Sequence, residues 1–152
     1  MSTTRLIMAE LPGDTERMDT TELTVTTGDR EVVLDLTSTC RQWATERGGS
    51  GLLHVFVPHA TAGIAILETG AGSDDDLLAA LAELLPADDR WRHRHGSRGH
   101  GRSHVLPALV PPYATVPVVE GRLTLGTWQS ICLVDLNIDN EQRSVRLSLL
   151  RG

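Results

Sequence analysis

The chain has 152 residues, of which 14 are Lys or Arg and 20 are Asp or Glu, so its formal net charge is −6. Every basic residue is arginine, which excludes mechanisms that need a lysine Schiff base or the lysine of a P-loop. This length, with 40% apolar residues, predicts a single domain over residues 1–152, and the acidic average charge argues against a nucleic-acid partner.

The first third of the chain predicts two strands and a helix after a polar N-terminal segment. Residues 1–20 lack a hydrophobic period, which is typical of an arm or a short edge strand. Residues 20–27 alternate apolar side chains with threonines, as a half-buried strand does. Asp35 is placed to cap a helix over residues 36–47, and the apolar run 52–57 predicts the next strand.

The middle of the chain predicts a strand, a helix and a long loop. The apolar run 64–67 ends at Glu68. Ser73 and three following aspartates suit a helix start, and a leucine stripe continues that helix until Pro86. Residues 87–103 are polar, rich in His, Arg and Gly, and without period, so they predict a long loop.

The remainder of the chain predicts short strands separated by Gly and Pro signals. They cover residues 104–110, 115–119, 123–126, 129–136 and 144–150. Several short strands with two or three helices predict an α+β fold built on an antiparallel β-sandwich.

The two cysteines indicate the compartment. Cys40 and Cys132 lie far apart without C-x-x-C spacing, which favours reduced, packed thiols over a disulfide or a thiolate zinc site. A cytoplasmic protein is expected. No stretch approaches the roughly 20 apolar residues of a membrane span, so no membrane partner is expected.

Residues 91–104, WRHRHGSRGHGRSH, are the strongest anomaly in composition, because they hold four of the six histidines. His93 and His95 would project to one side of an extended segment, and His104 ends the tract. The tract is either a solvated, mobile His/Arg loop or a set of metal ligands. Residues 90–102 carry five arginines and no acid, which suits a small phosphorylated ligand.

Three other places offer candidate residues, each with an ordinary structural alternative. His59 follows an apolar strand, at a strand end where sites gather. Glu68 is either exposed or buried with a pKa raised toward the range of proton transfer. Trp128 and Gln129, behind Gly126, either stack on a ligand or pack the core and the sheet edge.

The order of these motifs resembles the YjbQ-like family, whose members are described as secondary thiamine-phosphate synthases. The resemblance rests on an apolar strand leading into PHATAG, on WRH with a second histidine eleven residues later, and on GRLTLGTWQSICLVDL. It implies a jelly-roll-like antiparallel β-sandwich assembled as a homotrimer, with a polar cleft near the subunit boundaries.

The resemblance also implies roles for individual residues. The implied catalytic residues are His59, Glu68, Trp128 and Gln129. The implied substrate-binding residues are Thr61, Arg92, Gly126 and Thr127. The implied metal ligands are His59, His93 and His104. The implied reaction is that of a transferase, which condenses a hydroxymethylpyrimidine diphosphate with a thiazole phosphate. A metal-dependent hydrolase and a non-catalytic ligand-binding trimer are the alternatives.

This chain departs from the family pattern at four positions. Leu67, Ala71, Gly99 and His100 stand where relatives carry acidic or amide side chains. Loss of those oxygens disfavours a hard ion such as magnesium, and an imidazole at position 100 favours zinc as the divalent metal.

Overall fold

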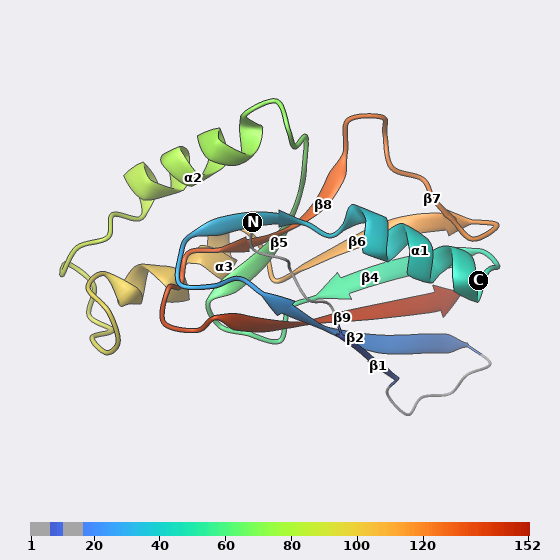
Figure 1. Ribbon diagram of the computed structural model, residues 1–152, viewed down its shortest axis with the longest axis horizontal. Helices are drawn as coiled ribbons and strands as arrows, with labels where there is room; N and C mark the ends of the chain where they lie inside the picture. Colours follow the sequence, from blue (N-terminus) through green and yellow to red (C-terminus); the bar gives the residue numbers. More distant parts are fainter. Residues whose placement is uncertain (1–6, 11–16) are drawn as a thin grey trace.

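The computed structural model describes residues 7–10 and 17–152, and residues 1–6 and 11–16 of the predicted arm lie outside the described residues. The described chain forms a six-stranded and a three-stranded antiparallel sheet (Figure 1). The larger, sheet A, has the order β1 (Ile7–Glu10), β2 (Met18–Thr26), β9 (Gln142–Arg151), β4 (Gly51–Phe56), β6 (Tyr113–Val119) and β7 (Arg122–Leu123). The smaller, sheet B, has the order β3 (Val32–Asp35), β8 (Ser130–Asp135) and β5 (Ala62–Leu67).

The helices are α1 (Thr37–Arg47), α2 (Ser73–Leu84) and α3 (Leu106–Leu109), preceded in the last case by the 3-10 helix η1 (His100–His104). The predicted α+β class with antiparallel sheets and two or three helices is therefore confirmed. No helix in the described ranges is both long and apolar enough to cross a bilayer.

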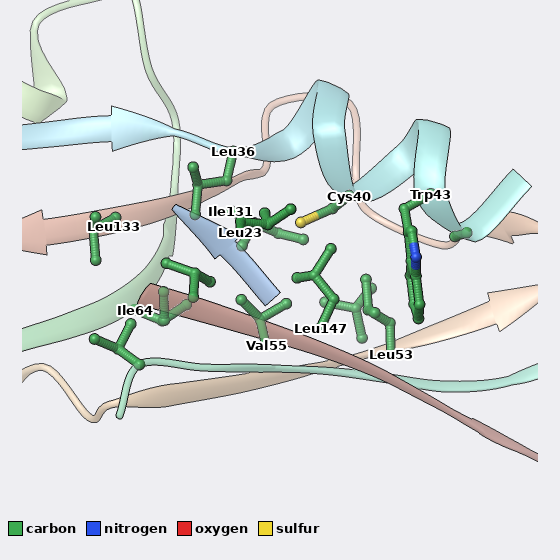
Figure 2. Packing of buried hydrophobic residues seen from close by; sticks show 14 of the residues in the cluster. Leu23, Leu36, Cys40, Trp43, Leu53, Val55, Ile64, Ile131, Leu133 and Leu147 are labelled. Atoms are coloured by element: carbon green, nitrogen blue, oxygen red, sulfur yellow. The ribbon is translucent and has the colours of Figure 1, made fainter. Parts of the chain in front are cut away.

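Two hydrophobic cores lie on opposite faces of sheet B. The larger core fills the space between sheet A, α1 and sheet B, with Trp43 of α1 fully buried against it (Figure 2). The smaller core joins sheet B to α2 and α3. Strand β8 divides its side chains between them, because Leu133 belongs to the first core and Val134 to the second. Burial on both faces explains why this strand has a continuous apolar sequence.

Three segments differ from the elements that the sequence predicts, and one of them is the strand expected over residues 123–126, of which only Leu123 lies in a strand, β7. Residues 104–110 were expected to be a strand, but they contain the end of η1 and helix α3. Pro107 explains the difference, since it lacks the N–H that a strand ladder needs and is tolerated in the first helical turn. Strand β3 was not predicted, because four residues are too few to show a period.

The register of β5 against β8 fixes which residues lie near the histidine loop. Ala62 pairs with Asp135 at one end of the two strands, and Leu67 pairs with Ser130 at the other. Residues just before β5 and just after β8 therefore share one end of sheet B. Residues just after β5 and just before β8 share the opposite end.

Candidate metal centre

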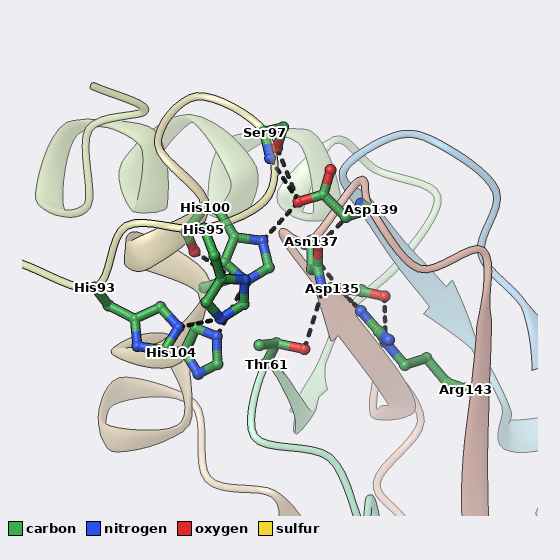
Figure 3. A network of polar contacts seen from close by, with 11 residues as sticks. Thr61, His93, His95, Ser97, His100, His104, Asp135, Asn137, Asp139 and Arg143 are labelled. Carbon is green, nitrogen blue, oxygen red and sulfur yellow. Dashed lines mark hydrogen bonds and ion pairs between the residues drawn. The ribbon is translucent and has the colours of Figure 1, made fainter. Parts of the chain in front are cut away.

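Four imidazoles meet at the end of sheet B that carries Asp135. One ring nitrogen from each of His93, His95, His100 and His104 lies within 4.8 Å of the others. In Figure 3 these rings point toward one another from the loop and from η1. The Nε2 atoms of His93 and His95 are 2.5 Å apart, and those of His100 and His104 are 3.1 Å apart.

The loop that carries the histidines is folded against the rest of the domain. Trp91 packs against the smaller core and donates a hydrogen bond from Nε1 to the carbonyl of Pro86 at 2.8 Å. Arg102 lies between His100 and His104 in the sequence of η1, and its side chain is buried. It donates from Nη1 to the carbonyl of Leu85 at 3.1 Å and forms an ion pair with Glu31. The backbone around the four rings is therefore held by contacts outside the cluster.

Gly96 permits a close approach of the loop to Asp139 and His100. Its φ of +72° lies in the left-handed region, and a Cβ at this position would lie 2.5 Å from Oδ2 of Asp139 and 2.9 Å from Nδ1 of His100. Any other residue here would therefore strain the backbone, and its Cβ would displace Asp139 and His100.

Asp139 supports the cluster from the connection between β8 and β9. Its Oδ2 lies 2.6 Å from Nδ1 of His100 and 3.0 Å from both the backbone N and the Oγ of Ser97. The hydrogen bond from the Ser97 backbone is the main cause that lowers the pKa of Asp139, with further lowering by His100 and opposition from burial. This carboxylate is therefore charged at neutral pH.

The pKa of His104, the last histidine of the cluster, is lowered. Burial is the largest cause of its lowered pKa, followed by the neighbouring charges of His93, His100 and His95. The neutral, metal-ligating form of His104 is therefore favoured at neutral pH.

A polar hollow of about 340 Å³ adjoins the cluster and is lined by its loop, including Arg94 and Arg98. Arg92, predicted to bind substrate, is exposed on the same loop. The arginine surplus of this loop is partly balanced by two acids, since Asp88 pairs with Arg90 and Asp89 lies 3.8 Å from Arg98.

His59 and Thr61 lie at this end of sheet B but have other partners. Nε2 of His59 accepts a hydrogen bond from the backbone N of Ser144 at 2.9 Å, which occupies the lone pair that a metal would need. Thr61 Oγ1 accepts a hydrogen bond from Nδ2 of Asn137 at 3.3 Å. His59 is not among the four converging histidines.

The remaining candidate residues lie at the opposite end of sheet B. Glu68 follows β5, and the run that contains Trp128 and Gln129 precedes β8. Trp128 is 73% exposed, and Oε1 of Gln129 accepts a hydrogen bond from the backbone N of Gly126 at 2.8 Å. A six-residue strand separates the two ends, about 20 Å at 3.3 Å per residue, so one chain does not join them in one site.

A separate polar hollow of about 400 Å³ lies at that opposite end. It is lined by Thr127 and Gln129 together with Asp35 and Arg41. The pKa of Asp35 is raised by burial but lowered by a larger combined effect of hydrogen bonds from Thr37, Thr69 and Ser130, so it lies below its usual range.

The structure adds one residue, Asp139, that the sequence did not single out. His95 and His100 complete the cluster. The sequence marked His95 by its spacing from His93 and His100 by its departure from the family pattern, but only His59, His93 and His104 were predicted as ligands. Asp139 lies 39 residues from His100 and had no signal that linked it to the tract.

Comparison with known proteins places the chain in a family. Residues 21–152 match the family described as UPF0047 protein YjbQ-like. The chain belongs to this family. It is 61% identical over 135 residues to the UPF0047 protein Rv2556c of Mycobacterium tuberculosis, covering 89% of this chain and 100% of that relative. It is 36% identical over 115 residues to the UPF0047 protein YugU of Bacillus subtilis, covering 72% of this chain and 83% of YugU.

Two solved structures share the fold. A YbjQ-like protein of unknown function from Sulfolobus solfataricus superposes with a TM-score of 0.83 at 26% identity, covering 90% of this chain and 99% of that one. A hypothetical protein from Aeropyrum pernix gives a TM-score of 0.78 at 34% identity, covering 88% and 99%.

These comparisons correct the predicted activity. The relatives named above are described as UPF0047 proteins, as hypothetical or as of unknown function, and none of them is described as a synthase or a hydrolase. The prediction of thiamine-phosphate synthesis is therefore wrong, and the hydrolase alternative is withdrawn with it. The structure agrees with this correction, because His59 and Glu68, two of the predicted catalytic residues, lie at opposite ends of β5. The homotrimer stays a prediction.

Proposed function

We propose that this UPF0047 protein binds a borderline divalent metal ion, zinc in the first place, through His93, His95, His100 and His104. The observation that supports the proposal is the convergence of four imidazole nitrogens within 4.8 Å of one another. Four donors at 2.0–2.1 Å from a tetrahedral zinc ion lie about 3.4 Å apart, so small rotations of the rings satisfy this geometry.

The chemistry of the donors selects the class of metal. Imidazole suits zinc, copper, nickel and iron, whereas magnesium and calcium require oxygen ligands. Within the described residues, the carboxylate that contacts the cluster is Asp139, and it lies on the Nδ1 side of His100 while Nε2 faces His104. A cluster with nitrogen donors throughout disfavours magnesium.

The protonation state of His104 also supports the proposal. Metal binding requires neutral imidazoles, and four rings at these distances repel one another when they are protonated. The pKa of His104 is lowered mainly by burial and then by the charges of His93, His100 and His95, so its neutral form is favoured. A divalent cation among the four nitrogens would replace lone-pair repulsion with coordination.

Elemental analysis of protein purified without a histidine tag tests the proposal. After gel filtration in metal-free buffer, about one zinc per chain is expected, as for a site with a single tetrahedral ion. The His93→Ala/His104→Ala double variant should lose the metal. His54→Ala is the matched control, because His54 lies on β4 and bonds Thr115 instead. Zinc absent from the wild type after reconstitution, or retained by the double variant, would overturn the proposal.

A further inference from the structure

Asp139 lies outside the cluster and contacts it through its carboxylate. A single oxygen, Oδ2, accepts from His100 Nδ1 at 2.6 Å and from the N and Oγ of Ser97 at 3.0 Å each. The His100 side chain is 7% exposed and that of Asp139 is 31% exposed, so the contact is shielded from water on the His100 side. A charged acceptor in such a place makes a strong hydrogen bond.

This contact fixes the tautomer of His100. A carboxylate only accepts hydrogen bonds, so the proton of the neutral ring lies on Nδ1. Nε2 then carries the lone pair, and this is the atom that faces Nε2 of His104 at 3.1 Å. Asp139 thus presents His100 to the cluster with its ligating atom already in place.

Asp139 is itself held by a chain of contacts that begins in the core. Oδ1 of Asp135 accepts a hydrogen bond from the backbone N of Asn137 at 2.9 Å, and Oδ1 of Asn137 accepts one from the backbone N of Asp139 at 2.9 Å. Asp135 is fully buried in a bidentate pair with Arg143. The D-x-N-x-D run resembles a calcium-binding loop, but the guanidinium of Arg143 occupies the cation's place at Asp135.

We propose that Asp139 is a positioning residue of the metal centre, which orients His100 and fixes its Nε2 as the ligand atom. This role rests on the proposed metal-binding function and deepens it. Metal-bound histidines commonly donate their second ring nitrogen to a carboxylate, which fixes the ring and increases its basicity. Asp139 supplies that carboxylate from a different segment of the chain, 39 residues after His100.

The first test compares zinc affinity in three variants by competition with a chromophoric chelator. Asp139→Asn should weaken zinc binding by about 10- to 100-fold, the usual effect of losing such a partner. Ser97→Ala removes one hydrogen bond to Asp139 but keeps the contact of Asp139 with His100, so it should weaken zinc binding less than Asp139→Asn does. Asp89→Asn removes the same charge from the wall of the hollow, where Asp89 pairs with Arg98. Asp89→Asn is the charge control and should bind zinc as the wild type does.

Each outcome has a distinct meaning. Wild-type affinity in Asp139→Asn would overturn the positioning role alone. Equal weakening in Asp89→Asn would also overturn it, because the effect would then be one of general charge. A wild-type protein that binds no zinc would overturn the metal centre itself, and that result precedes any comparison of variants.

A second test uses the wild-type protein and does not depend on the folding of a variant. Long-range ¹H–¹⁵N correlation spectra of the zinc-loaded protein report which ring nitrogen carries the proton. His100 should be protonated at Nδ1 and bound to zinc through Nε2. Coordination through Nδ1, or a proton on Nε2, would overturn the role of Asp139.

Discussion

Arg143 and Asp135 form an ion pair in which both side chains are completely buried, at 0% exposure each. Nε of Arg143 donates to Oδ2 at 2.7 Å and Nη2 donates to Oδ1 at 3.1 Å, so the carboxylate is bound at both oxygens. Such a pair stabilises the fold only while it is intact, because either charge alone would be left without water.

The first prediction concerns this pair. Arg143→Met should lower the free energy of unfolding by about 3–5 kcal/mol, since it leaves a buried carboxylate uncompensated. Arg146→Met, three residues further along β9, is the matched control, because its pair with Glu22 is partly exposed and is expected to contribute at most about 1 kcal/mol. Urea unfolding at pH 7 measures both, and equal losses would contradict the argument.

The second prediction concerns pH and His59. Burial is the main cause that lowers the pKa of His59 below its ordinary value of 6.5, with the nearby Arg143 charge as the next cause. The unfolded chain therefore binds more protons than the folded protein between the lowered value and 6.5. Stability from this group is fully present above pH 6.5 and decreases as the pH falls through that window.

His59→Gln tests this effect, because the glutamine oxygen can still accept the hydrogen bond from Ser144 but cannot titrate. Urea unfolding of the metal-free wild type and variant should show a smaller loss of stability in the variant between neutral pH and pH 5, about two pH units in all. The same loss in both proteins would contradict the assignment.

The third prediction concerns Gly96. Gly96→Ala should weaken zinc binding, because its Cβ would displace Asp139 and His100. Gly28→Ala is the matched control: Gly28 has a φ of +76°, close to the +72° of Gly96, but a Cβ there would meet nothing within 4 Å. Both variants should lose about 1–2 kcal/mol of stability from backbone strain, and only Gly96→Ala should lose metal affinity. A matching loss of affinity in Gly28→Ala would contradict this reasoning.

The fourth prediction concerns the two thiols. Burial is the main cause that raises the pKa of both Cys40 and Cys132 to about 12, with the charge of Asp35 as a second cause. The thiolate, which is the reactive form, is therefore scarce at pH 8. Neither thiol should react with a disulfide reagent in the folded protein, whereas both should react in denaturant. Fast labelling of the folded protein would show that a core opens.

The sequence allowed the antiparallel class to be predicted because alternation along strands such as β2 is a local signal. The two-core arrangement could not be predicted in this way. The apolar run of β8 does not reveal that Leu133 and Val134 serve different cores, since that depends on sheet A and α2 packing on opposite faces. Residues 104–110 were wrongly predicted to be a strand for a related reason. A short apolar run without a period does not distinguish a strand from a helix.

The histidine-rich tract predicted the region of the candidate site, but only two of its four histidines, His93 and His104, were implied as ligands, together with His59. His95 and His100 join His93 and His104 because the loop turns back through glycines with positive φ, which a reading of extended spacing does not anticipate. The contact of the loop with Asp139 joins residues 39 positions apart. Such a long-range contact has no signature in the loop itself.

The order of strands in sheet A has a consequence for biosynthesis. Strand β9 is the last of the strands of sheet A in chain order and so leaves the ribosome after them, yet it lies between β2 and β4 and pairs with both. A nascent chain that ends before β9 already carries the four histidines but leaves β2 and β4 without the strand that joins them. The same strand carries Arg143, which completes the support of Asp139. Metal captured during translation would therefore meet loosely held imidazoles, and the well-ordered centre would form only after β9 is inserted.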